Sequence, residues 1–423
     1  MTRSESLWQW TKCVSKNMPE LTGSQARLLA WWSYGIVVTG SCGRLTVATL
    51  LGLLRAEKVA NIEQRLYEWC LDADDKSGRQ RRALDLAVCQ VALLRWIVRL
   101  WVGTQLALTL DATSLGDRFV VLVVSVVYRG IGIPVAWTVL PANVKGSWRD
   151  EFWRLLRLLQ PAVPADWTVI VLADRGLSSS GLYQQIKRLR WHPFLRINST
   201  AKFQPGGKQH HWYWLLDLLH PAGRQPRQQW QGRGRCFKDK GSSIDCTLLA
   251  WWGEQYEEPW FILTDLSPAA CAATWYGLRS WCEQGFKCNK RGAWQWQHTR
   301  MHHPQRAARL WLALAVATFW TVAVASDLEC ETSLQAPDQP DWHTLLDLAA
   351  TLAPARAGQP ARRIRTIRLL RLGRLWLLVQ AIAHRPLPLP TTLLPEPWPA
   401  PPPNTTKSRP TRSSQPFMKN LPP

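Results

Sequence analysis

The sequence predicts an α/β fold in which a mixed β-sheet follows a helical N-terminal region. Two observations support this. Residues 1–103 place apolar side chains at the three- and four-residue spacing that is typical of helices. From Leu106 onward the pattern changes to short aliphatic runs, separated by amphipathic stretches of helical length. With 423 residues, the chain is long enough for two or three domains with a sizeable core.

The N-terminal region is predicted to be a bundle of helices. Four candidates are Gln25–Tyr34, Leu45–Lys58, a helix beginning at Asn61, and Arg79–Trp101. Asn61 is suited to cap the third helix, with Gln64 at the capping-box position. The tight connection before Asn61 resembles a helix-turn-helix, which would leave Arg55 and Arg65 available to DNA. A plain helical bundle fits the same residues equally well.

The central region supplies the strands of the predicted sheet. The strand candidates are Leu106–Leu110, Phe119–Tyr128, Ile133–Leu140, Trp167–Ala173 and Pro193–Ile197, and the helix candidates are Ser147–Gln160 and Ser178–Arg190. Gly130 and Gly132 stand where a hairpin would turn. Three strands, helix, strand, helix, strand is the order of a ribonuclease H-like mixed sheet. The fold class is therefore predicted as α/β, a ribonuclease H-like mixed sheet preceded by an N-terminal helical domain.

The remaining segments complete the predicted domain organisation. It comprises a helical domain at 1–103, a catalytic domain at 104–198 and 269–330, a β-rich insertion at 199–268, a basic helical region at 331–385, and a proline-rich disordered tail at 386–423. Leu310–Ser326 is uncharged and mostly apolar, and we expect a buried core helix there. Arginines interleaved with Ile and Leu in Ala353–Ala383 indicate an amphipathic helix for DNA or a partner subunit, with a membrane surface as the alternative.

Composition limits the partners. The net charge of +22 favours a polyanionic partner, with nucleic acid ahead of an anionic membrane surface. Ten scattered cysteines without a Cys-x2-Cys pair argue against a zinc ribbon and suggest reduced cytosolic thiols. The N-terminus lacks the apolar core of a signal peptide, so a cytoplasmic location is expected.

The segment Tyr276–Lys290 carries the most distinctive polar pattern. Read as one α-helix at about 100° per residue, it places Tyr276, Arg279, Glu283 and Lys290 on one face. Such a face would offer a carboxylate to a metal ion and cations to nearby phosphates. A solvated face with spaced charges is the alternative interpretation.

Two aspartates upstream end predicted buried strands. Asp111 lies in Thr-Leu-Asp-Ala-Thr, and Asp174 lies in Leu-Ala-Asp-Arg-Gly, where Gly176 permits a sharp exit. A lone aspartate at a strand end is more often a turn or cap residue. Asp117 competes with Asp111, but it precedes a strand.

The spacing Tyr-x2-Arg-x3-Glu-x6-Lys of Tyr276, Arg279, Glu283 and Lys290 resembles the signature of a large group of bacterial insertion-sequence transposases, the fourth insertion-sequence family. The resemblance covers roughly residues 106–326. These are DDE enzymes with an Asp, Asp, Glu triad on a ribonuclease H-like fold. The resemblance implies that Asp111, Asp174 and Glu283 are catalytic, that the two aspartates lie on adjacent strands, and that a β-rich insertion precedes the glutamate.

Three acids of this kind are suited to two Mg²⁺ ions about 3.5–4 Å apart, with Mn²⁺ as a substitute. The resemblance also implies that Tyr276, Arg279 and Lys290 contact DNA phosphates and that the N-terminal helices, with Arg65, bind terminal repeats. Lys287, Arg291 and Arg300 extend the basic run past the signature. His298, His302 and His303 lack an acidic partner at metal-ligand spacing, so a structural or DNA-facing role is expected.

The predicted function is cut-and-paste transposition by a DDE transposase. The predicted partners are terminal inverted repeats and target DNA, with a homodimer on the paired ends in the bacterial cytosol, associated with the nucleoid, and no membrane. Tryptophans of the insertion, such as Trp214 and Trp252, are candidates for stacking a flipped base. The alternative is a transposase-derived DNA-binding protein without catalytic activity, and the third interpretation is a membrane-surface protein.

Overall fold

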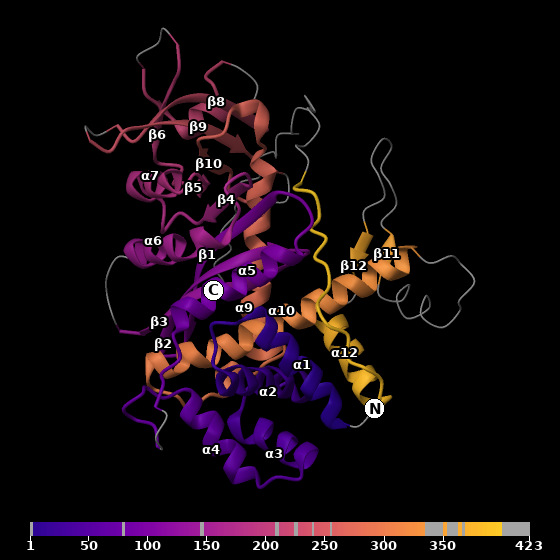
Figure 1. Ribbon diagram of the computed structural model, residues 1–423. Coiled ribbons are helices and arrows are strands. Elements are labelled where there is room, and N and C mark those ends of the chain that lie inside the picture. The colour runs from indigo at the N-terminus through magenta and orange to yellow at the C-terminus, as the bar shows by residue number, and fades with distance from the viewer. Residues whose placement is uncertain are drawn as a thin grey trace, which may run out of the picture. The chain divides into compact units, whose positions relative to one another are not determined.

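The computed structural model describes residues 3–77, 81–143, 148–207, 211–223, 227–238, 241–253, 256–334, 350–352, 363–365 and 369–399. The expected helix start at Ser147, Arg362 and Arg368 of the basic segment, and the tail from residue 400 lie outside these ranges. The chain divides into two compact units (Figure 1). The first comprises Met1–Leu195 and Tyr276–Trp398, and the second is built from Arg196–Trp275.

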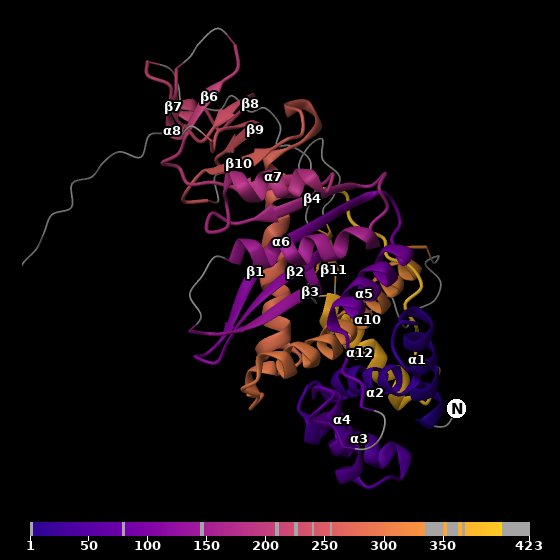
Figure 2. The ribbon, with the colours of Figure 1, turned by 60° about the vertical axis from the view of Figure 1, so that its left-hand side comes forward.

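The first unit contains the predicted mixed sheet. Its strands are β1 (Gln105–Leu115), β2 (Phe119–Tyr128), β3 (Ile131–Pro141), β4 (Thr168–Ala173) and β5 (His192–Arg196). They are ordered β3-β2-β1-β4-β5, with β1 antiparallel to β2 and parallel to β4, and β4 parallel to β5. Parallel neighbours need crossover connections, which α6 (Trp148–Leu159) and α7 (Ser180–Arg188) supply; α6 lies against the sheet (Figure 2). The predicted fold class is confirmed.

One local expectation for the first hairpins is wrong, and a second is right for Gly130 but wrong for Gly132. Strand β1 does not end at Asp111 but continues to Leu115, because residues 112–115 stay paired with β2. The turn between β2 and β3 is made by Arg129 and Gly130, both at positive φ. Gly132 is instead inside β3, where it has a packing role in the candidate site.

Five helices form the N-terminal region of the same unit. They are α1 (Arg3–Asn17), α2 (Gly23–Thr39), α3 (Arg44–Arg55), α4 (Val59–Trp69) and α5 (Leu86–Leu100). Helices α3 and α4 are joined by three residues, as the expected helix-turn-helix requires. The predicted cap at Asn61 is wrong, since α4 begins at Val59 and Asn61 lies within its first turn. A capping box is found at Thr22 and Gln25 of α2 instead.

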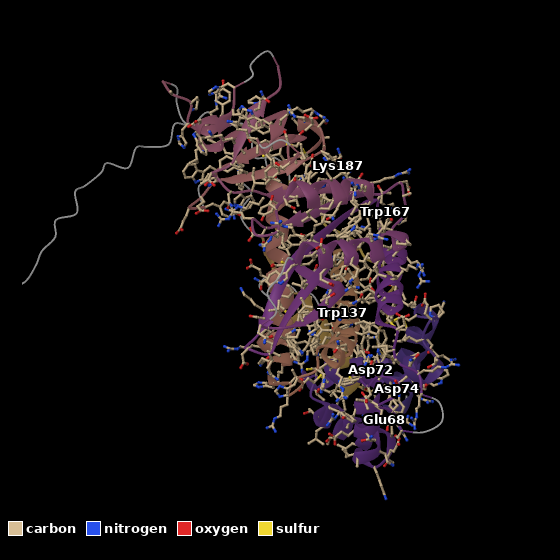
Figure 3. The ribbon with its side chains drawn as sticks, turned by 90° about the vertical axis from the view of Figure 1, so that its left-hand side faces the viewer. Glu68, Asp72, Asp74, Trp137, Trp167 and Lys187 are labelled. Carbon is tan, nitrogen blue, oxygen red and sulfur yellow. The ribbon has the colours of Figure 1, made fainter. Side chains whose placement is uncertain are left out.

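Helix α10 (Pro304–Leu334) is the centre of the unit's core. Its segment Pro304–Glu329 is long and apolar enough to cross a membrane by length and composition, and its most apolar window is completely buried. Trp320 of α10 stacks on Trp10 of α1 with ring centroids 4.0 Å apart. Trp137 of β3, which is labelled in Figure 3, donates from Nε1 to the carbonyl of Ala308 at 2.8 Å. The burial of the predicted core helix is confirmed.

The basic C-terminal segment contributes α12 (Leu369–Ile382), which packs on α10 and α2 in the same unit (Figure 1). A Cβ at Gly373 would overlap the carbonyl oxygen of Thr321, so glycine permits this close approach. Arg374 donates from Nε to the carbonyl of Val37 at 2.9 Å, near the C-terminus of α2. Arg374 therefore serves the chain's own packing.

The second unit is β-rich, as predicted for the insertion. It contains β6 (Lys202–Pro205), β7 (Tyr213–Trp214), α8 (Leu215–Leu219), β8 (Gln229–Cys236), β9 (Ile244–Trp251) and β10 (Trp260–Thr264). Its strands are antiparallel in the order β10-β9-β8-β6-β7. Trp251 packs edge-on against Trp260, with ring centroids 5.0 Å apart, whereas Trp214 is exposed.

Candidate active site

The signature segment is not the single α-helix that the spacing predicts. Ala273–Arg279 forms 3₁₀ turns, α9 (Ser280–Lys287) is α-helical, and Cys288–Gly292 forms one π-helical turn. These three helix types rotate by different angles per residue, so the polar residues do not share one face. Tyr276 is consequently buried, with 4% of its surface exposed.

Two glycines bring α9 onto β3. A Cβ at Gly132 would lie 2.8 Å from the Cα of Cys282, and a Cβ at Gly285 would overlap the carbonyl oxygen of Gly132. Backbone thus lies directly on backbone at this crossing. The close approach carries Cys282 and Glu283 to the sheet beside Asp111.

Three acids gather around one guanidinium in what we call the acid cluster: Asp111, Asp174, Glu283 and Arg279. Leu110 pairs with Ala173 across the parallel strands, which brings the aspartates that follow them together. Arg279 Nη2 lies 3.2 Å from Oδ2 of Asp111 and 3.7 Å from Oδ2 of Asp174. Arg279 Nη1 lies 3.7 Å from Oε1 of Glu283. The structure therefore brings the three predicted acids together.

Neighbouring groups orient the two aspartates. Asp111 Oδ1 accepts a hydrogen bond from the backbone N–H of Ala112 at 2.8 Å. Asp111 Oδ2 accepts a hydrogen bond from the thiol of Cys282 at 3.0 Å. The hydroxyl of Tyr276 donates to Oδ1 of Asp174 at 3.4 Å. Sequence reasoning missed Cys282, since nothing in its spacing distinguishes it from the other scattered cysteines.

Burial and charge act on the titratable groups of the acid cluster. Burial alone would lower the pKa of Arg279, but the negative charges around it, led by Asp111, raise this pKa above its usual value. Burial raises the pKa of the Cys282 thiol, and the adjacent Asp111 carboxylate raises it further. Arg279 is therefore charged, and Cys282 is a neutral hydrogen-bond donor.

The chemistry of the donors fits a divalent metal ion, because carboxylate oxygens are the hard ligands that Mg²⁺ prefers. Their present spacing fits a guanidinium instead. Within the described ranges, no three His, Cys, Asp or Glu side chains are close enough together to hold a metal ion. Asp174 and Glu283 are accessible, with 44% and 54% of their side-chain surfaces exposed, whereas Asp111 has 19% exposed.

A second feature, which we call the cation pocket, lies where α9 passes into the π-helical turn. It has a volume of about 510 Å³ and includes three cationic side chains, Lys287, Lys290 and Arg291. The other lining residues are Ser114, Leu115, Gly116, Gly292 and Gln297, so no acid lines it. Burial lowers the pKa of Lys290, and the charge of Arg291 lowers it further. Three of the predicted DNA contacts therefore share one pocket.

Buried contacts fix the turn that carries this pocket. The Nε1 of Trp294 donates to the hydroxyl of Thr318 on α10 at 2.8 Å, and the Thr318 hydroxyl oxygen lies 3.5 Å from Oδ1 of Asn289. Asn289 and Trp294 are almost completely buried. Helix α10 thus holds in place the π-helical turn that carries Lys290 and Arg291.

The other predicted site residues lie apart from the acid cluster. Arg300, His298, His302 and His303 line a cavity of about 650 Å³ beside α3 and α4. Arg65 Nη1 lies 2.6 Å from Oε1 of Glu57, so this ion pair partly neutralises the charge of Arg65 within the helical region. Asp117, the competing acid, is exposed in the turn between β1 and β2.

A ribonuclease H-like sheet with three acids, beside a pocket of cations, defines a protein suited to phosphodiester chemistry. Residues 116–320 match the family model described as the transposase DDE domain. The match includes Asp174 and Glu283 and begins just after Asp111.

Solved structures add a distant likeness. One match is the cryo-EM structure of the piggyBac transposase synaptic complex with hairpin DNA, with a TM-score of 0.35, 12% identity, and coverage of 83% of each chain. This likeness is too weak to support an argument about the site. No curated protein matches the sequence significantly.

Proposed function

We propose that the protein is a DDE transposase that cleaves DNA at the ends of an insertion sequence and joins those ends to target DNA. One observation carries the proposal. Acids from two adjacent parallel strands and from α9 converge in a chain that matches the family model of the transposase DDE domain over residues 116–320. This convergence of residues far apart in the sequence is what a metal-dependent phosphodiester reaction requires.

Asp111, Asp174 and Glu283 are the proposed ligands of two Mg²⁺ ions, for which Mn²⁺ would substitute. Ions held by these carboxylates would activate the attacking hydroxyl and stabilise the leaving oxygen. The chain's own contribution is to hold the carboxylates in place. Cys282 and the Ala112 N–H fix the rotamer of Asp111, and Tyr276 steadies Asp174.

The cation pocket is the proposed binding site for DNA phosphates near the reacting bond. Lys287, Lys290 and Arg291 bring three positive charges to one pocket without an acid to neutralise them. Phosphates would neutralise these charges and release counterions. Terminal-repeat binding by the N-terminal helices and a homodimer on two paired ends complete the proposed cut-and-paste reaction.

Cleavage of end-labelled DNA that carries the element's own inverted repeats tests the proposal. The purified protein is expected to nick this DNA with Mg²⁺ or Mn²⁺ and not with EDTA. Asp174→Asn should reduce cleavage by at least about 10³-fold, the scale of losing an essential electrostatic group. Asp117→Asn is the matched control, because Asp117 is an exposed aspartate outside the acid cluster, and it should cleave normally.

Two results would count against this function. Tight binding of the repeats without cleavage under any divalent ion would favour the transposase-derived DNA-binding protein. Equal loss of cleavage in Asp117→Asn and Asp174→Asn would show that the acid cluster is not the reacting site.

A further inference from the structure

We propose that Arg279 competes with divalent metal ions for Asp111, Asp174 and Glu283, so that the protein alone binds metal weakly and phosphate capture by Arg279 raises its metal affinity. This inference rests on the proposed function, because it concerns the same three acids. It assigns Arg279 a positioning role before the reaction, in addition to the phosphate contact that the signature resemblance implies.

The first argument is the place that the guanidinium occupies. Arg279 reaches all three acids at once, from 3.2 Å at Asp111 to 3.7 Å at Asp174 and Glu283. A metal ion that uses the same oxygens needs the space between them. A guanidinium and a metal ion therefore cannot both occupy the centre of the acid cluster.

The second argument is electrostatic. Three carboxylates drawn together repel one another unless a positive charge lies among them. Arg279 supplies that charge, and only 15% of its side chain is exposed, so water screens the attraction incompletely. Removing this guanidinium should therefore increase the affinity of the three carboxylates for another cation.

The third argument is that Arg279 is incompletely satisfied where it lies. Its Nε is buried and has no hydrogen-bond partner. Two of its three carboxylate contacts are 3.7 Å long, which is beyond ordinary hydrogen-bond length. A DNA phosphate offers the paired oxygens that a guanidinium binds best. Arg279 can therefore exchange its carboxylates for a phosphate when a metal ion takes its place among the acids.

The cation pocket makes that exchange accessible. Lys287 lies one turn of α9 beyond Glu283, and Lys290 and Arg291 follow it around the pocket. A DNA backbone held there brings phosphates towards the acid cluster. Because coupling between two ligands is reciprocal, DNA should raise metal affinity by the same factor by which metal raises DNA affinity.

Metal binding to the full chain without DNA tests the inference, with Mn²⁺ as the titrant in isothermal calorimetry. Arg279→Gln should bind Mn²⁺ at least about tenfold more tightly than the wild type, which corresponds to about 1.4 kcal/mol. Lys187→Gln is the matched control, because it removes the same charge from an exposed position of α7, outside the acid cluster and the cation pocket. The control should change the affinity by less than about threefold, the effect of a screened distant charge.

A stability measurement covers the case in which Arg279→Gln folds poorly. Without metal its melting temperature should lie below that of the wild type, because three acids lose their cation. Added Mn²⁺ should raise the melting temperature of Arg279→Gln by more than it raises that of the wild type. A purely structural role of Arg279 would lower the melting temperature without enlarging the response to Mn²⁺.

The outcomes separate the inference from the function. Wild type and Arg279→Gln binding Mn²⁺ equally tightly, with binding lost in Asp174→Asn, would overturn the competition and leave the catalytic acids intact. Failure of both proteins to bind Mn²⁺ at the acid cluster would overturn the inference and the proposed function together.

Discussion

The acid cluster and the cation pocket both use side chains of the segment Arg279–Arg291, yet they balance charge in opposite ways. In the acid cluster, three carboxylates face one guanidinium and are partly neutralised within the chain. In the cation pocket, three positive side chains converge without an acid among the lining residues. The first region has the oxygen ligands that small cations prefer, and the second suits an extended polyanion, which is the pairing that the proposed metal-dependent DNA chemistry needs.

The largest expected effect separates the cation pocket from the rest of the basic surface. The logarithm of the DNA association constant falls linearly with the logarithm of the salt concentration. Replacing Lys287, Lys290 and Arg291 together by glutamine should make this slope shallower by about 2.7, since each phosphate contact contributes about 0.9. At 0.1 M salt this corresponds to roughly 10²–10³-fold weaker DNA binding. Fluorescence anisotropy across a salt series measures both quantities.

The control for that experiment removes the same charge from the end of α7 and the turn after it, by replacing Lys187, Arg188 and Arg190 with glutamine. These three cations are exposed in another part of the same unit. In this control the slope of log K against log salt should change by less than about 0.9, the contribution of a single phosphate contact. An equal fall in both triple variants would mean that DNA binds a diffuse basic surface and that the cation pocket has no special role.

A smaller effect is expected from moving α9, which should disturb the acid cluster more than the cation pocket. Gly285→Ala places a methyl group against the carbonyl of Gly132 and should push α9 away from β3. The expected destabilisation is about 1–3 kcal/mol, and a displacement of Glu283 by about 1 Å would reduce cleavage roughly 10²-fold. DNA affinity should fall less, because the cation pocket is anchored separately through Asn289 and Trp294.

Gly181→Ala is the control for the glycine variant, because a Cβ there would meet only the hydroxyl of Ser179 at 3.9 Å. Chemical denaturation, cleavage and DNA binding are measured on both variants. Normal cleavage by Gly285→Ala would show that the close helix–strand approach does not position the acids.

The smallest expected effect is a pH dependence of DNA binding. Because burial and Arg291 lower the pKa of Lys290, this side chain loses its charge at a lower pH than an ordinary lysine. Its contribution to DNA affinity is present below that pKa and is lost as the pH rises through it. In Lys290→Arg the charge persists, so the DNA affinity of this variant should fall less between pH 7 and 10 than that of the wild type. The two losses of affinity should differ by up to about tenfold, the contribution of one phosphate contact. If the DNA affinities of the two proteins fall equally with pH, Lys290 does not contact the DNA.

Much of the fold could be predicted from the sequence because its signals are local. The alternation of aliphatic strands with amphipathic helices predicts the order of strands and helices along the chain, and the uncharged run in Leu310–Ser326 predicts the buried helix. The grouping of Asp111, Asp174 and Glu283 was implied by the resemblance that the spacing of the signature carries. These expectations depend on periodicity, or on a fixed spacing and the fold that it implies, which a single sequence displays.

The details of the acid cluster depend on contacts that the sequence does not display. A helix wheel at one fixed angle cannot anticipate 3₁₀ turns before Arg279 and a π-helical turn after Lys287. That irregular path buries Tyr276 and turns Arg279 towards the acids. The roles of Gly132 and Cys282 arise from the packing of α9 on β3, which is a tertiary contact between distant segments.

The most direct measurement of the central claim is a structure of the protein with its element-end DNA and Mn²⁺, in which anomalous scattering locates the ions. Mn²⁺ is expected among the carboxylate oxygens of Asp111, Asp174 and Glu283, with the Arg279 guanidinium moved onto a phosphate. Ions bound away from these acids, or an Arg279 that still contacts all three with DNA in place, would contradict the account.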